Sequence, residues 1–257
     1  MLNRKLLTLG LTALLGAALL QSPLLLAEEL PPAIKKIEAK GAKIIGSFDA
    51  PGGLKGYAAQ YLNRGMALYL TQDGNVLVGN LYDADGKDLS LAPLQKLVYE
   101  PMSKQVWANM ENSHWIQDGK KDAPRIVYLF SDPNCPYCNM FWEQARPWVD
   151  SGKVQLRHIM VGIIRADSPG KSAALLAAKD PQHALHEHEK SGKASSLEPL
   201  SKIPADVQAK LDANTQLMND LELSATPAIF YLDEKGNLQQ QQDAPSPDKL
   251  VTILGPK

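Results

Sequence analysis

The chain has 257 residues, which is enough for one or two domains with a sizeable hydrophobic core. Hydrophobic residues make up 44% of it and charged residues 21%, a globular composition that argues against a disordered chain. The formal net charge of −1, with no basic stripe carrying interleaved aromatic residues, argues against nucleic acid as a partner.

The first 27 residues have the pattern of an export signal. Arg4 and Lys5 precede an apolar run over residues 6–20, and a polar break follows at 21–23. A short positive region before such a run is typical of a secretory signal peptide, here with cleavage after Ala27. An uncleaved membrane anchor is the alternative, but a span needs roughly 20 uninterrupted apolar residues. We therefore expect export, with no later membrane span.

Residues 28–88 are predicted to form a small α+β unit. A short helix is expected within 28–42, where two prolines precede a helical pattern that ends at a glycine. Four runs rich in β-forming residues follow, at 43–48, 56–62, 66–71 and 76–82. Asp73-Gly74-Asn75 predicts a hairpin between the last two. A unit of about 60 residues is lean in core material, which favours a dimer.

Residues 89–115 are predicted to form a helical linker. Apolar residues recur at helical spacing between Leu91 and Met110, and Pro101 predicts a break or kink. These apolar positions are expected to pack on one or both neighbouring domains. Residues 117–124 are polar and turn-rich, and they predict a loop that opens the second domain.

The second domain, residues 116–257, begins with a predicted βαβ unit. A strand at 125–131, a helix at 137–149 and a strand at 154–161 follow one another closely, so the two strands should be parallel. Helices are then predicted at 172–178, 182–190 and 205–221, followed by strands at 228–232 and 238–242 and a helix at 247–254. This order is similar to the thioredoxin-like plan, with a helical insertion.

The chain has only two cysteines, and both lie in the motif Cys135-Pro136-Tyr137-Cys138. An exported protein that used disulfides for stability would scatter several cysteines along its length, so this pair indicates chemistry. At a helix start the two sulfurs can bridge, and the free N–H groups of the first turn lower the thiol pKa. Pro136 suits that turn because its missing N–H costs nothing there, and Tyr137 influences how strongly the thiolate is stabilised.

These positions assign roles to the two sulfurs. Cys135, at the helix start, is expected to be the exposed nucleophile, and Cys138, one turn further, the buried resolving thiol. A zinc site is the alternative, but structural zinc needs four ligands and there is no second cysteine pair. His183, His186 and His188 could contribute, although histidines in such a polar helix are usually solvated. We therefore favour redox chemistry and expect no metal.

Two further positions are candidates for a functional role. Thr226-Pro227 lies where a strand begins and fits a cis peptide, although a trans turn is more frequent on spacing alone. Asp132, three residues before Cys135, could assist proton transfer, but a solvated loop acid or helix cap is the simpler interpretation.

The chain resembles the DsbC/DsbG group of periplasmic thioredoxin-like enzymes over essentially its whole mature length. The similarity lies in Cys135-Pro136-Tyr137-Cys138, in Thr226-Pro227-Ala228-Ile229, and in residues 28–31, 48–53, 120–124 and 145–157. The cysteine motif alone is moderately specific, since cytosolic glutaredoxins also carry it. Asn134 departs from the group, in which an aromatic residue is expected before the first cysteine, and this affects the substrate groove.

The resemblance implies an α+β architecture of three parts. These are a cystatin-like dimerisation domain at residues 28–88, a helical linker at 89–115 and a thioredoxin-like catalytic domain with a helical insertion at 116–257. It implies a V-shaped homodimer joined through the N-terminal domains. It also implies that Pro227 is cis and faces the cysteine pair, with the Thr226 backbone placed to pair with a substrate chain.

The activity implied by the resemblance is that of a periplasmic thiol–disulfide oxidoreductase and isomerase. Such a protein reduces or reshuffles disulfides in oxidised or misfolded periplasmic proteins, reduces sulfenylated cysteines and binds substrates in a chaperone-like way. The membrane reductase DsbD would keep it reduced. Exchange of this kind requires no organic cofactor or metal. Two alternatives remain: a non-enzymatic chaperone, and a DsbA-like oxidant, against which Thr226 argues because oxidant relatives usually have Val there.

Overall fold

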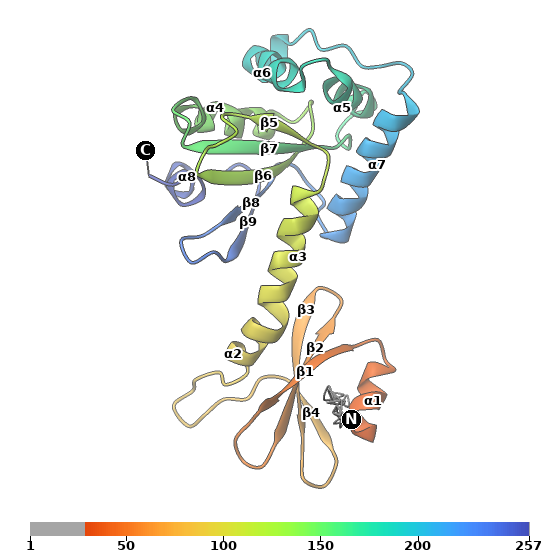
Figure 1. Ribbon diagram of the computed structural model, residues 1–257, viewed down its shortest axis with the longest axis vertical. Coiled ribbons are helices and arrows are strands. Elements are labelled where there is room, and N and C mark those ends of the chain that lie inside the picture. The colour runs from red at the N-terminus through yellow and green to blue at the C-terminus, as the bar shows by residue number, and fades with distance from the viewer. Residues whose placement is uncertain (1–28, 257) are drawn as a thin grey trace, which may run out of the picture.

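The computed structural model describes residues 29–256, so the expected signal peptide at 1–27 lies outside the described residues. The chain forms two sheets, and a long helical segment runs between them (Figure 1). Within residues 29–256, no helix combines the length and the apolar character that a membrane span requires.

The first sheet is antiparallel, with its strands in chain order. It contains β1 (Lys43–Asp49), β2 (Lys55–Tyr61), β3 (Arg64–Leu70) and β4 (Val76–Val78), preceded by α1 (Pro32–Glu38). Ile34 of α1 covers one face, and Leu94 and Val98 of the helical segment cover the other. The fourth strand is shorter than predicted because the chain leaves the ladder at Gly79, whose φ of +139° favours glycine.

The helical segment runs through Pro101 without a break, but a π turn lies directly before that part of the helix. It consists of α2 (Leu91–Leu94), a π turn (Gln95–Tyr99) and α3 (Glu100–Glu111). Pro101 has no N–H to donate, and the wider turn before it lets Glu100 N–H donate to Gln95 O, five residues back. Leu94 lies in the core of the first sheet and Met110 in that of the second, so the segment packs on both neighbours.

The second sheet has the strand order β5-β7-β6-β8-β9. Its elements are β5 (Trp115–Asp118), β6 (Arg125–Ser131), α4 (Pro136–Asp150), β7 (Val154–Met160), α5 (Ser168–Ala177), α6 (Pro181–Ser191), a 3-10 turn (Gly192–Ala194), α7 (Ala205–Asp220), β8 (Ala228–Leu232), β9 (Leu238–Gln242) and α8 (Pro247–Leu254). The predicted βαβ unit is confirmed, because β6 and β7 pair in parallel.

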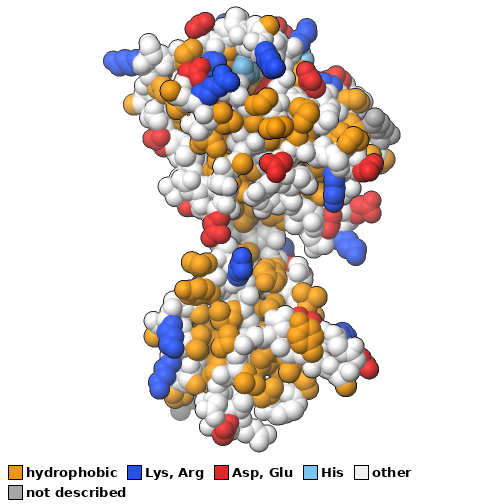
Figure 2. All heavy atoms as spheres, turned by 180° about the vertical axis from the view of Figure 1, so that it is seen from behind, with side chains coloured by type: hydrophobic (Ala, Val, Ile, Leu, Met, Phe, Trp, Pro, Cys, Tyr) orange, Lys and Arg blue, Asp and Glu red, His pale blue; other side chains and the backbone are white. Residues whose placement is uncertain are grey.

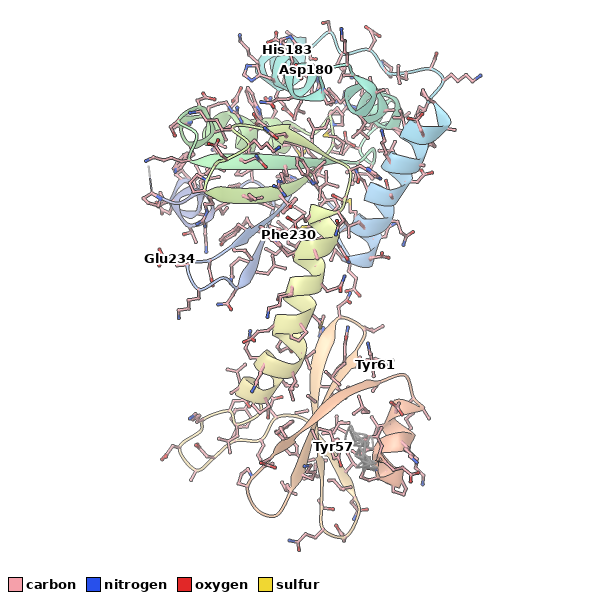
Figure 3. The ribbon with its side chains drawn as sticks, viewed as in Figure 1. Tyr57, Tyr61, Asp180, His183, Phe230 and Glu234 are labelled. Atoms are coloured by element: carbon pink, nitrogen blue, oxygen red, sulfur yellow. The ribbon has the colours of Figure 1, made fainter. Side chains whose placement is uncertain are left out.

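Alternation along β6 sends its side chains to two different layers. Val127 and Leu129 pack against α4 and α8, whereas Tyr128 and Phe130 pack against α3 and α7. Phe230 of β8 belongs to the second layer and lies near α3 (Figure 3). The helix that begins with the cysteine motif therefore lies directly over one face of the sheet.

Strand β5 was not predicted. Residues 117–124 were interpreted as a loop, and this is wrong for the first two of them. Gln117 and Asp118 extend a short strand that pairs antiparallel with β7. The polar side chain of Asp118 is buried in this strand because it meets two basic groups. Arg146 Nη1 of α4 donates to Asp118 Oδ1 at 3.1 Å, and His158 Nε2 lies 3.6 Å from Oδ2.

Substituting Asp118→Asn is expected to destabilise this part of the protein by about 2 kcal/mol at pH 7. Burial alone raises the pKa of Asp118, but His158 and Arg146 outweigh it and lower that pKa from 3.8 to about 2. Because the folded pKa is depressed, this stabilisation is fully present above pH 3.8 and is lost as the pH falls towards 2. The stability of the Asp118→Asn variant should therefore not show the loss that this carboxylate causes as the pH falls from 3.8 towards 2.

Urea unfolding followed by tryptophan fluorescence measures this effect, since the four tryptophans lie in or beside the second sheet, at 107, 115, 142 and 148. The matched control is Asp150→Asn, which removes the same charge from an exposed partner 3.6 Å from Arg146. It should change stability by less than about 0.5 kcal/mol. Equal losses in both variants would contradict the role assigned to burial.

Candidate active site

The cysteine motif lies at the N-terminus of α4, as predicted. Cys135 is the N-cap residue, and its Sγ accepts a hydrogen bond from the backbone N–H of Cys138 at 3.3 Å. Pro136 occupies the first helical position, where no N–H is required. The sulfur therefore sits against the positive end of a helix of 15 residues, an environment that stabilises a thiolate.

The Thr226–Pro227 step faces this sulfur. Its peptide bond is cis, as the resemblance implied, and Thr226 O accepts a hydrogen bond from Cys135 Sγ at 3.3 Å. Residues 91 positions apart in the chain thus meet at one point, where α4 begins and β8 is about to start. The structure brings together both parts of the predicted site.

Cys135 is buried, so the expectation of an exposed nucleophile is wrong as stated. Only 4% of the residue is accessible, because Thr226 and the first turn of α4 cover it. Pro136 and Tyr137 are the exposed members of the motif, the latter by 58%. Cys138 is buried, as predicted. A substrate must therefore approach past Tyr137 and Pro136 to reach the sulfur.

The surroundings separate the two thiols chemically. The Cys138 thiol, the Thr226 side chain and the backbone N–H groups of Cys138 and Tyr137 lower the pKa of Cys135 from 9.0 to about 6, against the effect of burial. Burial, together with the nearby Cys135 sulfur, raises the pKa of Cys138 well above 9.0. At neutral pH the first sulfur is therefore mostly a thiolate and the second is a thiol.

Thr226→Val is expected to raise the pKa of Cys135. The Thr226 hydroxyl is buried and has no hydrogen-bond partner among the described residues, and the Thr226 side chain lowers the pKa of Cys135, so we expect it to donate to the thiolate. Valine keeps the shape but loses this bond, which is worth about one pKa unit for a charged acceptor. Alkylation of Cys135 at pH 5 should slow about tenfold.

The pH dependence of carboxamidomethylation, with the modified cysteine identified by mass spectrometry, measures this shift. Thr215→Val is the matched control, because the Thr215 hydroxyl donates to Leu211 O within α7 and is remote from the sulfurs in the chain. A midpoint that stays near 6 in Thr226→Val would contradict the role of the hydroxyl.

Asp132 is buried, so its interpretation as a solvated loop acid is wrong. Its carboxylate accepts hydrogen bonds from the backbone N–H groups of Asn134, Ile163 and Ile164 and from the hydroxyl of Ser168, at 2.7 to 3.0 Å. Four donors from three segments leave it no free proton-transfer position facing the sulfurs. It holds the loop before Cys135 against the chain that follows β7.

Asn134 joins the same network and explains how the site tolerates this departure from the family. Its side chain donates to Asp167 and Ser168 and accepts from Lys171, each at 2.9 to 3.0 Å. A phenylalanine side chain could make none of these bonds. The position before Cys135 is therefore polar and tied to the start of α5.

The histidines of α6 differ in their surroundings. His183 lies exposed at the start of α6, where Asp180 caps the helix (Figure 3), whereas His188 is buried, contrary to its interpretation as a solvated residue. His188 Nε2 donates to Pro133 O at 2.8 Å, and Nδ1 pairs with Ser195 Oγ at 2.7 Å. Burial lowers the pKa of His188. Within residues 29–256, no three His, Cys, Asp or Glu side chains lie together in a way that could hold a metal ion.

Comparison with known proteins agrees with this site. A family model described as a thioredoxin-like domain matches residues 114–255. The thiol:disulfide interchange protein DsbG of Pseudomonas aeruginosa is 65% identical over 258 aligned positions, covering 100% of this chain and 99% of that protein. DsbG of Escherichia coli is 47% identical over 232 positions, covering 90% and 94%. DsbC of Pasteurella multocida is 25% identical over 212 positions, covering 80% and 82%.

The first two similarities extend well beyond the thioredoxin-like domain and include the N-terminal sheet and the helical segment. The motif at the start of α4 and the cis proline opposite it supply the geometry that thiol–disulfide exchange needs. The chain therefore belongs to the DsbG family of thiol:disulfide interchange proteins, which are thioredoxin-like oxidoreductases.

Proposed function

We propose that Cys135 is the attacking group and Cys138 the resolving group of a protein disulfide reductase and isomerase. The Cys135 thiolate attacks a substrate disulfide sulfur and forms a mixed disulfide, while the other substrate sulfur leaves with the electron pair. Attack on a sulfenic acid gives the same mixed disulfide and releases water. In reduction, Cys138 then displaces the substrate. In isomerisation, a second substrate thiol does so and leaves the pair reduced.

Substrates are proposed to bind over the Thr226–Pro227 step, flanked by Pro136 and Tyr137. An extended substrate segment would add as a strand beside the Thr226–Pro227 step and bring its sulfur to Cys135. Exposed apolar side chains near the motif, at Tyr137, Met140, Ile163 and Ile164, support contact with unfolded chains. This surface fits oxidised or misfolded proteins and a chaperone-like mode of binding.

We further propose that residues 28–88 form a dimerisation domain, with residues 89–115 as the linker to a catalytic domain at 116–257. Strand β4 is an edge strand, and Leu77, Val78 and the nearby Tyr82 are exposed. Hydrophobic side chains gather over this part of the molecule, below a narrow neck (Figure 2). A second copy of the chain would cover them, giving the V-shaped homodimer expected for this family.

Leu77→Asp is expected to convert such a dimer into a monomer, because a charge buried at the interface without a partner is costly. Sedimentation velocity of the full chain measures the change. Val251→Asp is the matched control, since Val251 is a similarly exposed apolar residue on α8. A monomeric parent chain, or equal dissociation of both variants, would contradict this interface.

The proposed setting is the periplasm, reached through the signal peptide at residues 1–27, with DsbD as the electron donor. The observation that carries the proposed function is the contrast between the two thiols, one with a lowered and one with a raised pKa. That contrast suits a reduced pair that attacks first through Cys135.

Two measurements test the function together. The redox state of the pair is trapped in cells by acid quench and alkylation, and the purified protein is assayed for reshuffling of a scrambled disulfide substrate. A reduced pair with reshuffling activity is expected. A predominantly oxidised pair with net disulfide formation would replace the proposal by an oxidant, and full biological rescue by Cys135→Ala would replace it by a chaperone.

A further inference from the structure

A buried hydroxyl lies beside the resolving cysteine without an evident structural purpose. Ser131 is the last residue of β6 and is fully buried, and its Oγ has no hydrogen-bond partner among the described residues. A buried hydroxyl without a partner costs about 1–3 kcal/mol, and alanine would avoid that cost. Such a group in a folded core therefore calls for an explanation.

The strand geometry aims this hydroxyl at the active-site helix. Val127 and Leu129 of β6 pack against α4, and side chains two residues apart share one face of a strand, so Ser131 points to the same layer. Cys138 lies in the first turn of α4 and is buried, and the Ser131 side chain opposes the rise in its pKa. The next backbone N–H, that of Asp132, interacts with the same sulfur.

We propose that Ser131 is a further catalytic residue, whose hydroxyl and the Asp132 N–H together donate hydrogen bonds to the Cys138 sulfur as it becomes a thiolate. This assignment rests on the proposed function, in which Cys138 resolves the mixed disulfide. Burial opposes ionisation of Cys138, so the thiolate needs local donors before it can attack. Ser131 supplies one that the sheet holds in place.

The step is balanced without any further reactant. The Cys138 thiol loses its proton, and its sulfur attacks Cys135 Sγ to form the Cys135–Cys138 disulfide. The bond between Cys135 Sγ and the substrate sulfur breaks, the substrate sulfur leaves with the electron pair, and it takes up one proton. Cys138 is oxidised and the substrate sulfur is reduced.

The hydroxyl also sets how long the mixed disulfide persists. Rapid resolution by Cys138 ends the encounter as a reduction, whereas slow resolution leaves time for a second substrate thiol to attack. Removing the Ser131 hydroxyl should therefore shift the balance from reduction towards isomerisation. A purely structural role for Ser131 would not move this ratio.

The test follows the mixed disulfide between Cys135 and glutathione in the full chain. Reduced protein is mixed with glutathione disulfide and quenched with acid, and mass spectrometry gives the decay of the adduct between pH 5 and 9. Ser131→Ala should slow the decay about five- to tenfold at pH 7 and shift its pH dependence upward. Ser131→Thr, which keeps a hydroxyl, should restore the parent rate within about twofold.

Further variants keep the test decisive. Ser131→Thr and Ser131→Val differ only in hydroxyl against methyl, so they repeat the comparison if Ser131→Ala fails to fold. Ser172→Ala removes an equally buried hydroxyl that donates to Val161 O, and should leave the decay unchanged. Equal decay in Ser131→Ala, Ser131→Val and the parent would overturn the role of Ser131. Absence of any Cys135 adduct in Cys138→Ser, which lacks the resolving thiol, would instead overturn the proposed function.

Discussion

Cys135→Ser is expected to abolish mixed-disulfide formation and to lower disulfide reduction by at least about 10³-fold. Serine fits the N-cap position and can keep the hydrogen bond from the Cys138 N–H, so the fold of α4 should be retained. The hydroxyl does not ionise near neutral pH, however, whereas the pKa of Cys135 is about 6. The variant therefore keeps the geometry and loses the nucleophile.

Reductase activity is measured as turnover of a disulfide peptide, with a thioredoxin-type coupled assay supplying the reductant. Thermal unfolding verifies that the variant is folded. The same variant is also tested for its ability to prevent the aggregation of an unfolded client. This second assay separates chaperone-like binding from disulfide reduction. Aggregation should still be suppressed, because the exposed apolar residues around the motif are unchanged. Retention of more than a few per cent of the reductase activity would mean that another group attacks the substrate.

Local patterns were sufficient to predict the catalytic part of the fold. Compact apolar runs indicate β6 and β7, and the cysteine motif followed by a helical pattern indicates the start of α4. The chain between the parallel strands is short enough to leave one connection, a right-handed crossover. Motif position and helix polarity are consequences of this local arrangement and contribute to the low pKa of Cys135, which also depends on the distant Thr226.

Contacts between distant segments could not be predicted in this way. The burial of Cys135 depends on Thr226, and the loop before it depends on Ser168 and on His188, which are 34 to 91 residues away from their partners. No local signal marks these pairs, since a histidine in a polar helix normally faces solvent. Strand β5 was missed for the same reason, because Asp118 is buried only where Arg146 meets it.

Cys138→Ser is expected to accumulate mixed disulfides between Cys135 and client proteins, which in the parent chain are resolved too quickly to be seen. Without the resolving sulfur, release depends on an external thiol, and the adducts should persist for minutes to hours. The choice of serine over alanine matters. The Cys138 side chain makes the largest contribution to the low pKa of Cys135, and a serine hydroxyl at position 138 can still donate to the Cys135 sulfur. Cys138→Ala should therefore trap clients more slowly at pH 6 than Cys138→Ser does.

Acid-quenched cell extracts, separated without reductant and analysed by mass spectrometry, give the trapped clients. The double variant Cys135→Ser with Cys138→Ser is the control and should trap none. Clients with a single cysteine would indicate reduction of sulfenic acids, since such proteins have no internal disulfide to offer. Clients with several cysteines would indicate disulfide reduction or isomerisation. If Cys138→Ser trapped no client while the parent chain stayed active, Cys138 would not be the resolving group. The roles of attacking and resolving cysteine would then have to be exchanged.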